Sequence, residues 1–316
     1  MHFLISLFRR LQIALSTFIS QPKAETDTSN QQQRSTFDTS TRSAHEDIFG
    51  ADGSPIFGEF IGGGITGSVF KISNDTVLKV PRLRTHLVDK NLETQVPCEN
   101  TNKAVLESLR REKQVYEHLG RVEGILPAWP TDAGIEMPYM SGGTAQDYFN
   151  THEIDLDTRL RWIKMVTDVV RRVHEKHVLI NDFHLGNFLL DDDLSLMMVD
   201  FGNSTIVPDD VKFGEYVHYA SSEKSDIAAV GSLIYEIMTG KGYMVFVNLK
   251  APFDIAERTP RGNGNGVDMW FPYWPPKEEL ADTTGILLGD IILRCWLKDG
   301  FQTMDQVCGA ISQALD

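Results

Sequence analysis

Two aspartates and an asparagine lie close together in residues 179–203, which read LINDFHLGNFLLDDDLSLMMVDFGN. Asp182 precedes and Asp200 follows two apolar runs, NFLL and SLMMV, and Asn187 begins the first run. A hairpin with the DDD run as its solvated turn would account for the central aspartates but not for the outer two. Because paired strands would bring Asp182 and Asp200 near each other, their carboxylates and an amide oxygen could converge. The segment therefore indicates a hard-oxygen site of the kind that suits Mg²⁺.

A glycine-rich stretch earlier in the chain could contact a phosphate. Residues 61–69, IGGGITGSV, contain G-x-G-x-x-G-x-V between two strand-like runs. Glycines let a hairpin tip approach a phosphate so that backbone N–H groups can donate to it, although a bare turn is the alternative. Further strand follows in place of a helix, which disfavours a dinucleotide-binding βαβ unit.

A lysine and a glutamate form a second candidate pair. Lys79 lies in the strand-like run DTVLKVP, and Val77 shares its face of that strand. A partly buried ammonium needs a partner, which Glu112 on the next predicted helix can supply. The alternative for Glu112 is an exposed i, i+4 partner on a charged helix.

The elements that must position these residues change type along the chain. From about residue 56, short β-type runs separated by Gly and Asn-Asp predict an antiparallel meander. Apolar periodicity predicts helices over residues 103–119, 157–177 and 225–240, near 283–297 and over 303–315. The sequence therefore predicts an α+β fold with a small β-rich lobe followed by a larger helical lobe.

Composition limits the function classes. The 316 residues are 41% hydrophobic and 23% charged, which is typical of a globular protein of one large domain or two lobes. The net charge of −14 argues against a nucleic-acid partner. Three widely spaced cysteines, Cys98, Cys295 and Cys308, fit neither a disulfide framework nor a zinc pattern. They favour a reducing compartment, and we expect a cytoplasmic protein.

The N-terminal residues form a separate segment. Residues 1–20 are apolar but interrupted by Arg9 and Arg10, so they contain no membrane-spanning run, and internal charges are unusual for a signal peptide. They could form an interfacial helix that contacts a membrane, a transit segment, a helix packed on its own domain or a poorly ordered terminus. Residues 21–50 are mostly polar, and we expect a flexible linker there.

In their order and spacing, these motifs resemble the eukaryotic protein-kinase superfamily from about Ile56 to the C-terminus. The matching elements are the Gly-rich loop 62–67, Lys79, Glu112, the D-x-x-x-x-N of Asp182 to Asn187, and the D-F-G of Asp200 to Gly202. MPYMSGG at 137–143 looks like the hinge, and Asp226 with Gly231 looks like the D-x-x-x-x-G of the large buried helix. The resemblance implies a two-lobed kinase-like fold with an N-lobe over 51–140, a mainly helical C-lobe over 141–316 and a nucleotide cleft between.

The same resemblance implies ATP and Mg²⁺ as cofactors and a protein substrate. The Gly-rich loop would cover the phosphates, and Lys79, oriented by Glu112, would contact them. Asp200 and Asn187 would hold magnesium, and Asp182 would accept the proton of the substrate hydroxyl. The residues expected at the nucleotide are Ile61, Gly62, Gly64, Gly67, Val69, Val77, Lys79, Pro138, Met140 and Leu189.

The sequence departs from the family pattern at three places. Asn181 stands where the His-Arg-Asp arginine is usual and cannot pair with a phosphorylated residue, so we predict that loop phosphorylation is not the switch. His184 occupies the position of a lysine that touches the γ-phosphate, and a neutral imidazole there brings a donor with less charge. No Ala-Pro-Glu is visible, and its usual arginine partner is absent after Trp296.

Three functions are compatible with these residues. An atypical serine/threonine-type protein kinase is favoured because Lys79, Glu112, Asp182, Asn187 and Asp200 are all present. A pseudokinase that binds nucleotide with little turnover would explain the missing motifs. The D-x-H-x-x-N spacing also resembles small-molecule phosphotransferases that act on aminoglycosides or choline.

Overall fold

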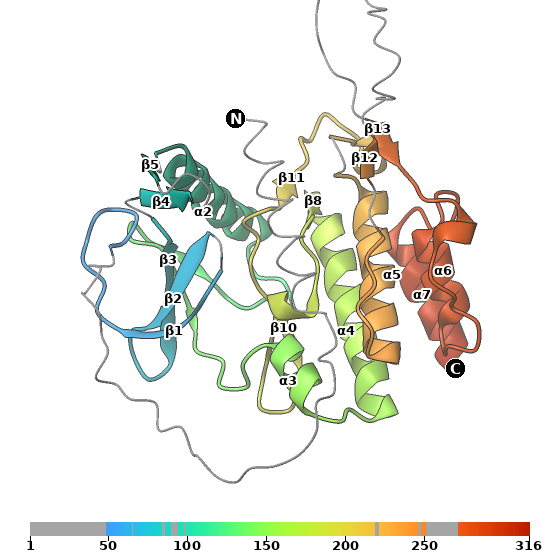
Figure 1. Ribbon diagram of the computed structural model, residues 1–316. Helices are drawn as coiled ribbons and strands as arrows, with labels where there is room; N and C mark the ends of the chain where they lie inside the picture. The colour runs from blue at the N-terminus through green and yellow to red at the C-terminus, as the bar shows by residue number, and fades with distance from the viewer. Residues whose placement is uncertain are drawn as a thin grey trace, which may run out of the picture. The chain divides into compact units, whose positions relative to one another are not determined.

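The computed structural model describes residues 49–64, 66–83, 86–89, 94–97, 99–218, 221–245, 248–250 and 271–316 (Figure 1). The predicted segment 1–20 lies outside the described residues, as does the predicted linker except its last two positions. Within the described part of the chain, every helix is too short or too polar to cross a bilayer.

The chain divides into two compact units. The first comprises the residues up to Leu109 together with Thr131–Glu136, and the second comprises Arg110–Pro130 together with Met137–Asp316. The domain boundary that the sequence suggested, between residues 140 and 141, stays a prediction.

The predicted antiparallel meander is present in the first unit. Strands β1 (Glu59–Gly63), β2 (Gly67–Lys71) and β3 (Thr76–Pro81) pair in sequence order. With β7 (Ile135–Pro138) and β6 (Trp129–Pro130) they form a sheet in the order β1-β2-β3-β7-β6. A short hairpin of β4 (His86–Asp89) and β5 (Thr94–Pro97) follows.

The apolar alternation of β2 and β3 explains the small core of this unit. Phe70, Leu78 and Val80 are buried together, and Ile56 and Ala133 pack against them. Residues spaced by two share one face of a strand, so Val77 and Lys79 lie on the opposite face of β3. Both are buried as well, which makes β3 a strand covered on its two faces.

Helix α2 (Glu99–Leu119) begins four residues before the predicted start and passes from the first unit into the second. The other described helices belong to the second unit, and four of the five begin at a side-chain N-cap. They are α3 (Ala145–Thr151), α4 (Leu156–Glu175), α5 (Glu223–Thr239), α6 (Gly289–Trp296) and α7 (Met304–Leu315). Thr144, Asp155, Ser222 and Thr303 accept hydrogen bonds as N-caps, and Gly240 ends α5 in the left-handed region.

The helix predicted near 283–297 is shorter than expected. Gly285 has φ of 76° and Leu288 has φ of 66°, and a right-handed helix cannot contain these backbone conformations. The helix therefore begins at Gly289.

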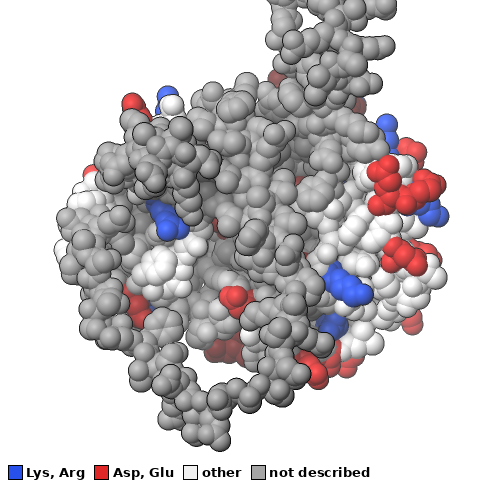
Figure 2. Space-filling view, in the orientation of Figure 1, with Lys and Arg blue, Asp and Glu red and all other residues white. Residues whose placement is uncertain are grey.

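Helices α4, α5, α6 and α7 lie side by side (Figure 1). Trp162 on α4 and Trp296 on α6 are completely buried. Acidic side chains gather over the C-terminal elements at the right of the view in Figure 2, in keeping with the net charge of −14. The helical character predicted for this part of the chain is confirmed.

Short strand pairs follow α4 in the chain. Strands β9 (Phe188–Leu190) and β10 (Leu196–Met198) form the predicted hairpin, with Phe188 opposite Met198. Strand β8 (Val178–Leu179) pairs with β11 (Thr205–Ile206). Strands β12 (Asn248–Lys250) and β13 (Phe271–Tyr273) form a further pair. Short 3-10 turns lie at Leu185–Asn187, Phe213–Glu215 and Lys277–Glu279.

Candidate active site

A buried carboxylate on α5 anchors the loop that carries Asp182. Asp226 accepts the backbone N–H groups of Ile180 (2.8 Å) and Asn181 (3.0 Å). It also lies 3.0 Å from Nε2 of His174, near the end of α4. Because buried polar groups need partners, these contacts hold the start of the loop against two helices of the same unit.

Asn181 has an unusual backbone conformation, with φ of 65°. Asparagine tolerates this left-handed region better than most side chains, because its short amide can bond locally. The Asn181 Nδ2 donates to the backbone oxygen of Asn203 (3.0 Å) and lies 3.1 Å from Thr205 Oγ1. Asn181 therefore binds the segment after Gly202 with neutral hydrogen bonds.

The carboxylate of Asp182 has a contact at each oxygen. The Asn203 Nδ2 donates to Oδ2 at 2.9 Å, and His184 Nε2 lies 3.7 Å from Oδ1. The Gly186 N–H donates to His184 Nδ1 at 3.1 Å, so a neutral imidazole carries its proton on Nε2, facing Asp182. A Cβ at position 186 would lie 2.9 Å from His184 Nδ1, which explains the glycine there.

The residues proposed to bind magnesium flank the β9–β10 hairpin, as the sequence predicted. Asn187 is buried, and its Nδ2 donates to the backbone oxygen of Asp182 at 3.1 Å. Since the amide nitrogen is used in this bond, Oδ1 is the atom that could bind a metal. Asp200 has φ of 66°, and its Oδ1 accepts the Gly202 N–H at 3.3 Å. One carboxylate and one amide oxygen fit Mg²⁺, which keeps waters and phosphate oxygens as its other ligands.

The second half of α2 contacts the D-F-G segment within the same unit. The Arg111 Nη1 donates to the backbone oxygen of Gly202 at 3.0 Å. The rings of Tyr116 and Phe201 meet edge to face, with centroids 5.1 Å apart. Both contacts anchor the segment that begins at Asp200, and no sequence motif pointed to Arg111 or Tyr116.

The Tyr116 hydroxyl is buried without a hydrogen-bond partner. Burial, followed by the negative charges of Glu112 and Asp200, raises the pKa of Tyr116 well above its ordinary value. The Asp200 backbone N–H opposes this rise. The phenol therefore lies in the field of two candidate site residues, Glu112 and Asp200.

Lys79 belongs to the first unit, on β3. It lies opposite Val69 of β2 and is 8% exposed. A Cβ at Gly67 would lie 3.0 Å from Lys79 Cε, so the last glycine of the loop leaves room for the lysine stem. Glu112 is 2% exposed and lies in the second unit, and its pairing with Lys79 stays a prediction.

The Gly-rich loop has room at its tip. The Gly64 N–H donates to the Gly67 oxygen at 2.8 Å, which closes the turn. A Cβ added at Gly62 or Gly64 would meet no atom within 4 Å, so packing within the described chain does not require these glycines. This agrees with a loop that a ligand's phosphates could approach.

The remaining nucleotide-lining candidates divide between the units. Ile61, Val69 and Val77 lie on β1, β2 and β3 in the first unit. Pro138 ends β7, Met140 follows it, and Leu189 is the middle residue of β9, all in the second unit. Their joint role at a nucleotide stays a prediction.

Lys224 on α5 bonds to backbone groups near the end of α6. Its Nζ donates to the backbone oxygens of Cys295 (3.1 Å) and Phe301 (2.8 Å) and so joins α5 to the end of α6. Burial lowers the pKa of Lys224 to about 8. The neighbouring Glu223 is also buried, and burial raises the pKa of its carboxyl.

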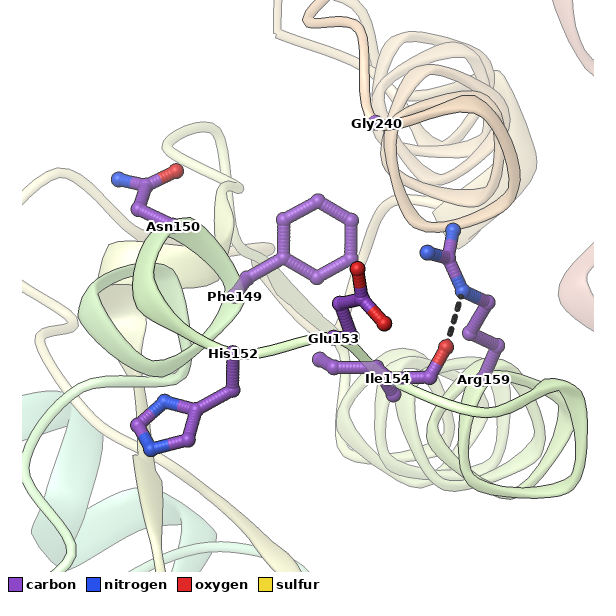
Figure 3. A pocket seen from close by; sticks show the side chains of 7 residues that line it. All are labelled: Phe149, Asn150, His152, Glu153, Ile154, Arg159 and Gly240. Atoms are coloured by element: carbon purple, nitrogen blue, oxygen red, sulfur yellow. Dashed lines mark hydrogen bonds between the residues drawn. The ribbon is translucent and has the colours of Figure 1, made fainter.

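A polar cavity opens elsewhere in the second unit, between α3, α4 and the end of α5 (Figure 3). The Arg159 side chain at its wall donates to the backbone oxygens of Ile154 (2.9 Å), Met238 (3.2 Å) and Ile237. The guanidinium is therefore already bonded to the backbone at the ends of these helices. The residues that line the cavity are Phe149, Asn150, His152, Glu153, Ile154, Arg159 and Gly240, and none belongs to the predicted site.

No family model matches the chain. Curated proteins with similar sequences include three protein kinases. The dual specificity protein kinase pyk3 of Dictyostelium discoideum is 25% identical over 178 residues, and the serine/threonine-protein kinase PrkC of Bacillus subtilis (strain 168) is 25% identical over 207 residues. The G-type lectin S-receptor-like serine/threonine-protein kinase At4g11900 of Arabidopsis thaliana is 31% identical over 132 residues. The matches include 52%, 58% and 35% of this chain but only 12%, 29% and 16% of the respective relatives.

Proposed function

Because this chain is related to the protein kinases, we propose that it transfers the γ-phosphate of ATP to a serine or threonine hydroxyl of a protein. The observation that carries this proposal is the loop geometry around Asp182. Within the second unit, Asn203 and His184 contact the two oxygens of that carboxylate. The Asn187 amide nitrogen is bonded to the Asp182 backbone, so that the amide oxygen can bind a metal.

Asp182 would act as the proton acceptor. The substrate oxygen forms a bond to the γ-phosphorus while the bond from that phosphorus to the β–γ bridging oxygen breaks, and ADP leaves. The hydroxyl proton moves to Asp182, whose contacts with Asn203 and His184 orient its carboxylate. The His184 Nε2–H, which faces the Asp182 carboxylate, would donate to an oxygen of the γ-phosphoryl group as it is transferred.

Asp200 and Asn187 would hold Mg²⁺, which when bound neutralises negative charge on the phosphates. Arg111 and the Tyr116–Phe201 contact support Asp200 by fixing the residues that follow it. In the first unit, Lys79 would contact the α- and β-phosphates, with Glu112 as its partner. The backbone N–H groups of Gly62, Gly64 and Gly67 would face the phosphates. The adenine and ribose would lie among Ile61, Val69, Val77, Pro138, Met140 and Leu189.

Transfer of labelled phosphate from ATP tests this proposal. Purified full-length protein with magnesium would be offered a generic basic protein substrate, beside Asp200→Ala and Asp182→Asn variants. Asp192→Ala, an exposed position in the hairpin turn, is the matched control. We expect label on protein from the wild type and from Asp192→Ala, with a loss of about 10²-fold or more in the other two.

Other outcomes would select the alternatives. Nucleotide binding without transfer to any acceptor would identify a pseudokinase and contradict the proposal. The same assay with choline and an aminoglycoside as acceptors tests the small-molecule alternative, which the D-x-H-x-x-N spacing of Asp182, His184 and Asn187 favours. Label that appears only on these acceptors would show that the substrate is a small molecule and not a protein.

We further propose a cytoplasmic protein that touches membranes through residues 1–20. Deletion of residues 1–46 followed by cell fractionation tests this part separately. An unchanged distribution would contradict a targeting role for the segment.

A further inference from the structure

The segment after the D-F-G motif is joined to the Asp182 loop by a set of hydrogen bonds that we call the clasp, residues 203–206 with residues 178–182. Thr205 pairs with Leu179 and Ile206 with Val178 in the β8–β11 ladder. The fully buried Ser204 donates through Oγ to the Ile180 backbone oxygen at 3.1 Å.

The clasp fixes the backbone of Asn203 at its carbonyl and at the residue that follows it. Its backbone oxygen accepts Asn181 Nδ2 at 3.0 Å, and the next residue, Ser204, is bonded to Ile180. With its backbone fixed in this way, the Asn203 side chain reaches Asp182 Oδ2 at 2.9 Å. A charge-assisted hydrogen bond from a preset donor holds a carboxylate in one orientation.

We propose that Asn203 is a positioning residue that sets the orientation of the Asp182 carboxylate, and that the clasp holds Asn203 for this task. This inference rests on the proposed function, since it assigns Asp182 as the proton acceptor. Apart from the Asp182 carboxylate itself, the clasp uses neutral groups, and none of its bonds requires a phosphate.

The alternative is that Asn203 is an ordinary exposed side chain that contacts a nearby acid. An exposed hydrogen bond contributes little to stability, so a merely structural Asn203 could be replaced by an isostere without consequence. Orientation is more demanding, because a displacement of about 1 Å at a reacting group can cost about 10²-fold in rate. The two roles therefore differ in how kcat responds to the isosteric substitution.

Two variants and a matched control separate these roles. Asn203→Ala removes the donor, and Asn203→Asp keeps the shape but places a second carboxylate beside Asp182. Asn150→Asp makes the same change at an exposed position of α3, outside the proposed site. We expect kcat to fall about 10-fold or more in Asn203→Ala and further in Asn203→Asp. Asn150→Asp should match the wild type, and the KM for ATP and the Tm of all three variants should stay close to wild-type values.

A kcat that remains within twofold of wild type in Asn203→Asp would overturn the inference. A higher KM for the acceptor at unchanged kcat would also overturn it, because Asn203 would then bind substrate and not position Asp182. Crystal structures of the wild type and Asn203→Ala give a readout without turnover. A rotated Asp182 carboxylate in the variant supports the inference, and an unchanged one overturns it. If the wild type transfers no phosphate, the proposed function fails by itself, and this structural comparison still decides the role of Asn203.

Discussion

The phenol ring of Tyr116, on α2, meets the ring of Phe201 edge to face at a plane angle of 83° and brings its hydroxyl near Asp200. Edge-to-face pairs stabilise by about 1 kcal/mol beyond their buried area. The contact joins a helix to the residue that follows the proposed magnesium ligand. A shift of this part of α2 would therefore change the position of Asp200.

Tyr116→Phe should stabilise the protein. The ring contact with Phe201 stays, while a buried hydroxyl without a hydrogen bond disappears. Removing such a group should raise the free energy of unfolding by about 1 kcal/mol, measured by urea denaturation. Tyr116→Leu serves as the contrast, because it also removes the ring and should destabilise. A Tyr116→Phe variant that is less stable than wild type would show that the hydroxyl has a bonding partner in solution.

Replacement of the hydroxyl residues after the D-F-G motif should leave phosphate transfer intact. The clasp holds this segment without a phosphate, so Tyr216→Phe, Tyr219→Phe, Ser221→Ala and Ser222→Ala should not lower kcat more than about twofold each. Thr205 is left out of this set because its Oγ1 also contacts Asn181 within the clasp. Tyr219 lies outside the described residues. Ser222→Ala should cost about 1 kcal/mol of stability, because Ser222 caps α5. A large loss of kcat in any variant that keeps its Tm would contradict this prediction.

Gly186→Ala should displace the His184 imidazole. The added Cβ would lie 2.9 Å from Nδ1 of His184 and would break the bond that sets its tautomer. We expect kcat to fall about 10-fold, because His184 Nε2 would no longer face Asp182. Gly309→Ala on α7, where a Cβ meets no atom within 4 Å, is the control and should be neutral or slightly stabilising. Equal kcat in Gly186→Ala and wild type would show that the position of the His184 imidazole does not affect phosphate transfer.

Lys224 should make stability depend on pH in the alkaline range. Its pKa is about 8 in the folded protein, below the ordinary 10.5, because burial disfavours its charge. Between these values the unfolded chain binds more protons, so stability rises as the pH increases through that window. Relative to Lys224→Met, the wild type should gain about 1 kcal/mol of unfolding free energy from pH 7 to pH 9.

Comparing the wild type with Lys224→Met removes the effects of other titrating groups from this measurement. Burial raises the pKa of Cys295 to about 12, which lowers stability as the pH rises above 9. That contribution is shared by wild type and Lys224→Met and largely cancels in their difference. A difference that stays constant over the range would show that Lys224 titrates normally.

Much of the local structure was predictable from the sequence. The β9–β10 hairpin and the meander of β1, β2 and β3 follow from alternation and short turns, because neighbouring residues determine such pairings. The order and spacing of the Gly-rich loop, Lys79, Asp182, Asn187 and Asp200 are enough by themselves to indicate a kinase relationship. The sequence could not place the start of α6, because left-handed backbone at Leu288, a residue without that preference, is imposed by its surroundings.

The contacts that orient the proposed site were decided by tertiary structure. Asn203 reaches Asp182 across 21 residues of sequence, Asn181 reaches Thr205 across 24 and His174 reaches Asp226 across 52. No periodicity or motif specifies such pairs, because side chains far apart in the sequence meet only when helices and strands pack. The sequence by itself determined which chemical groups are present and which short elements carry them. The packing of α4, α5 and the clasp decided which oxygen of Asp182 is bonded, because only the folded chain brings Asn203 to it.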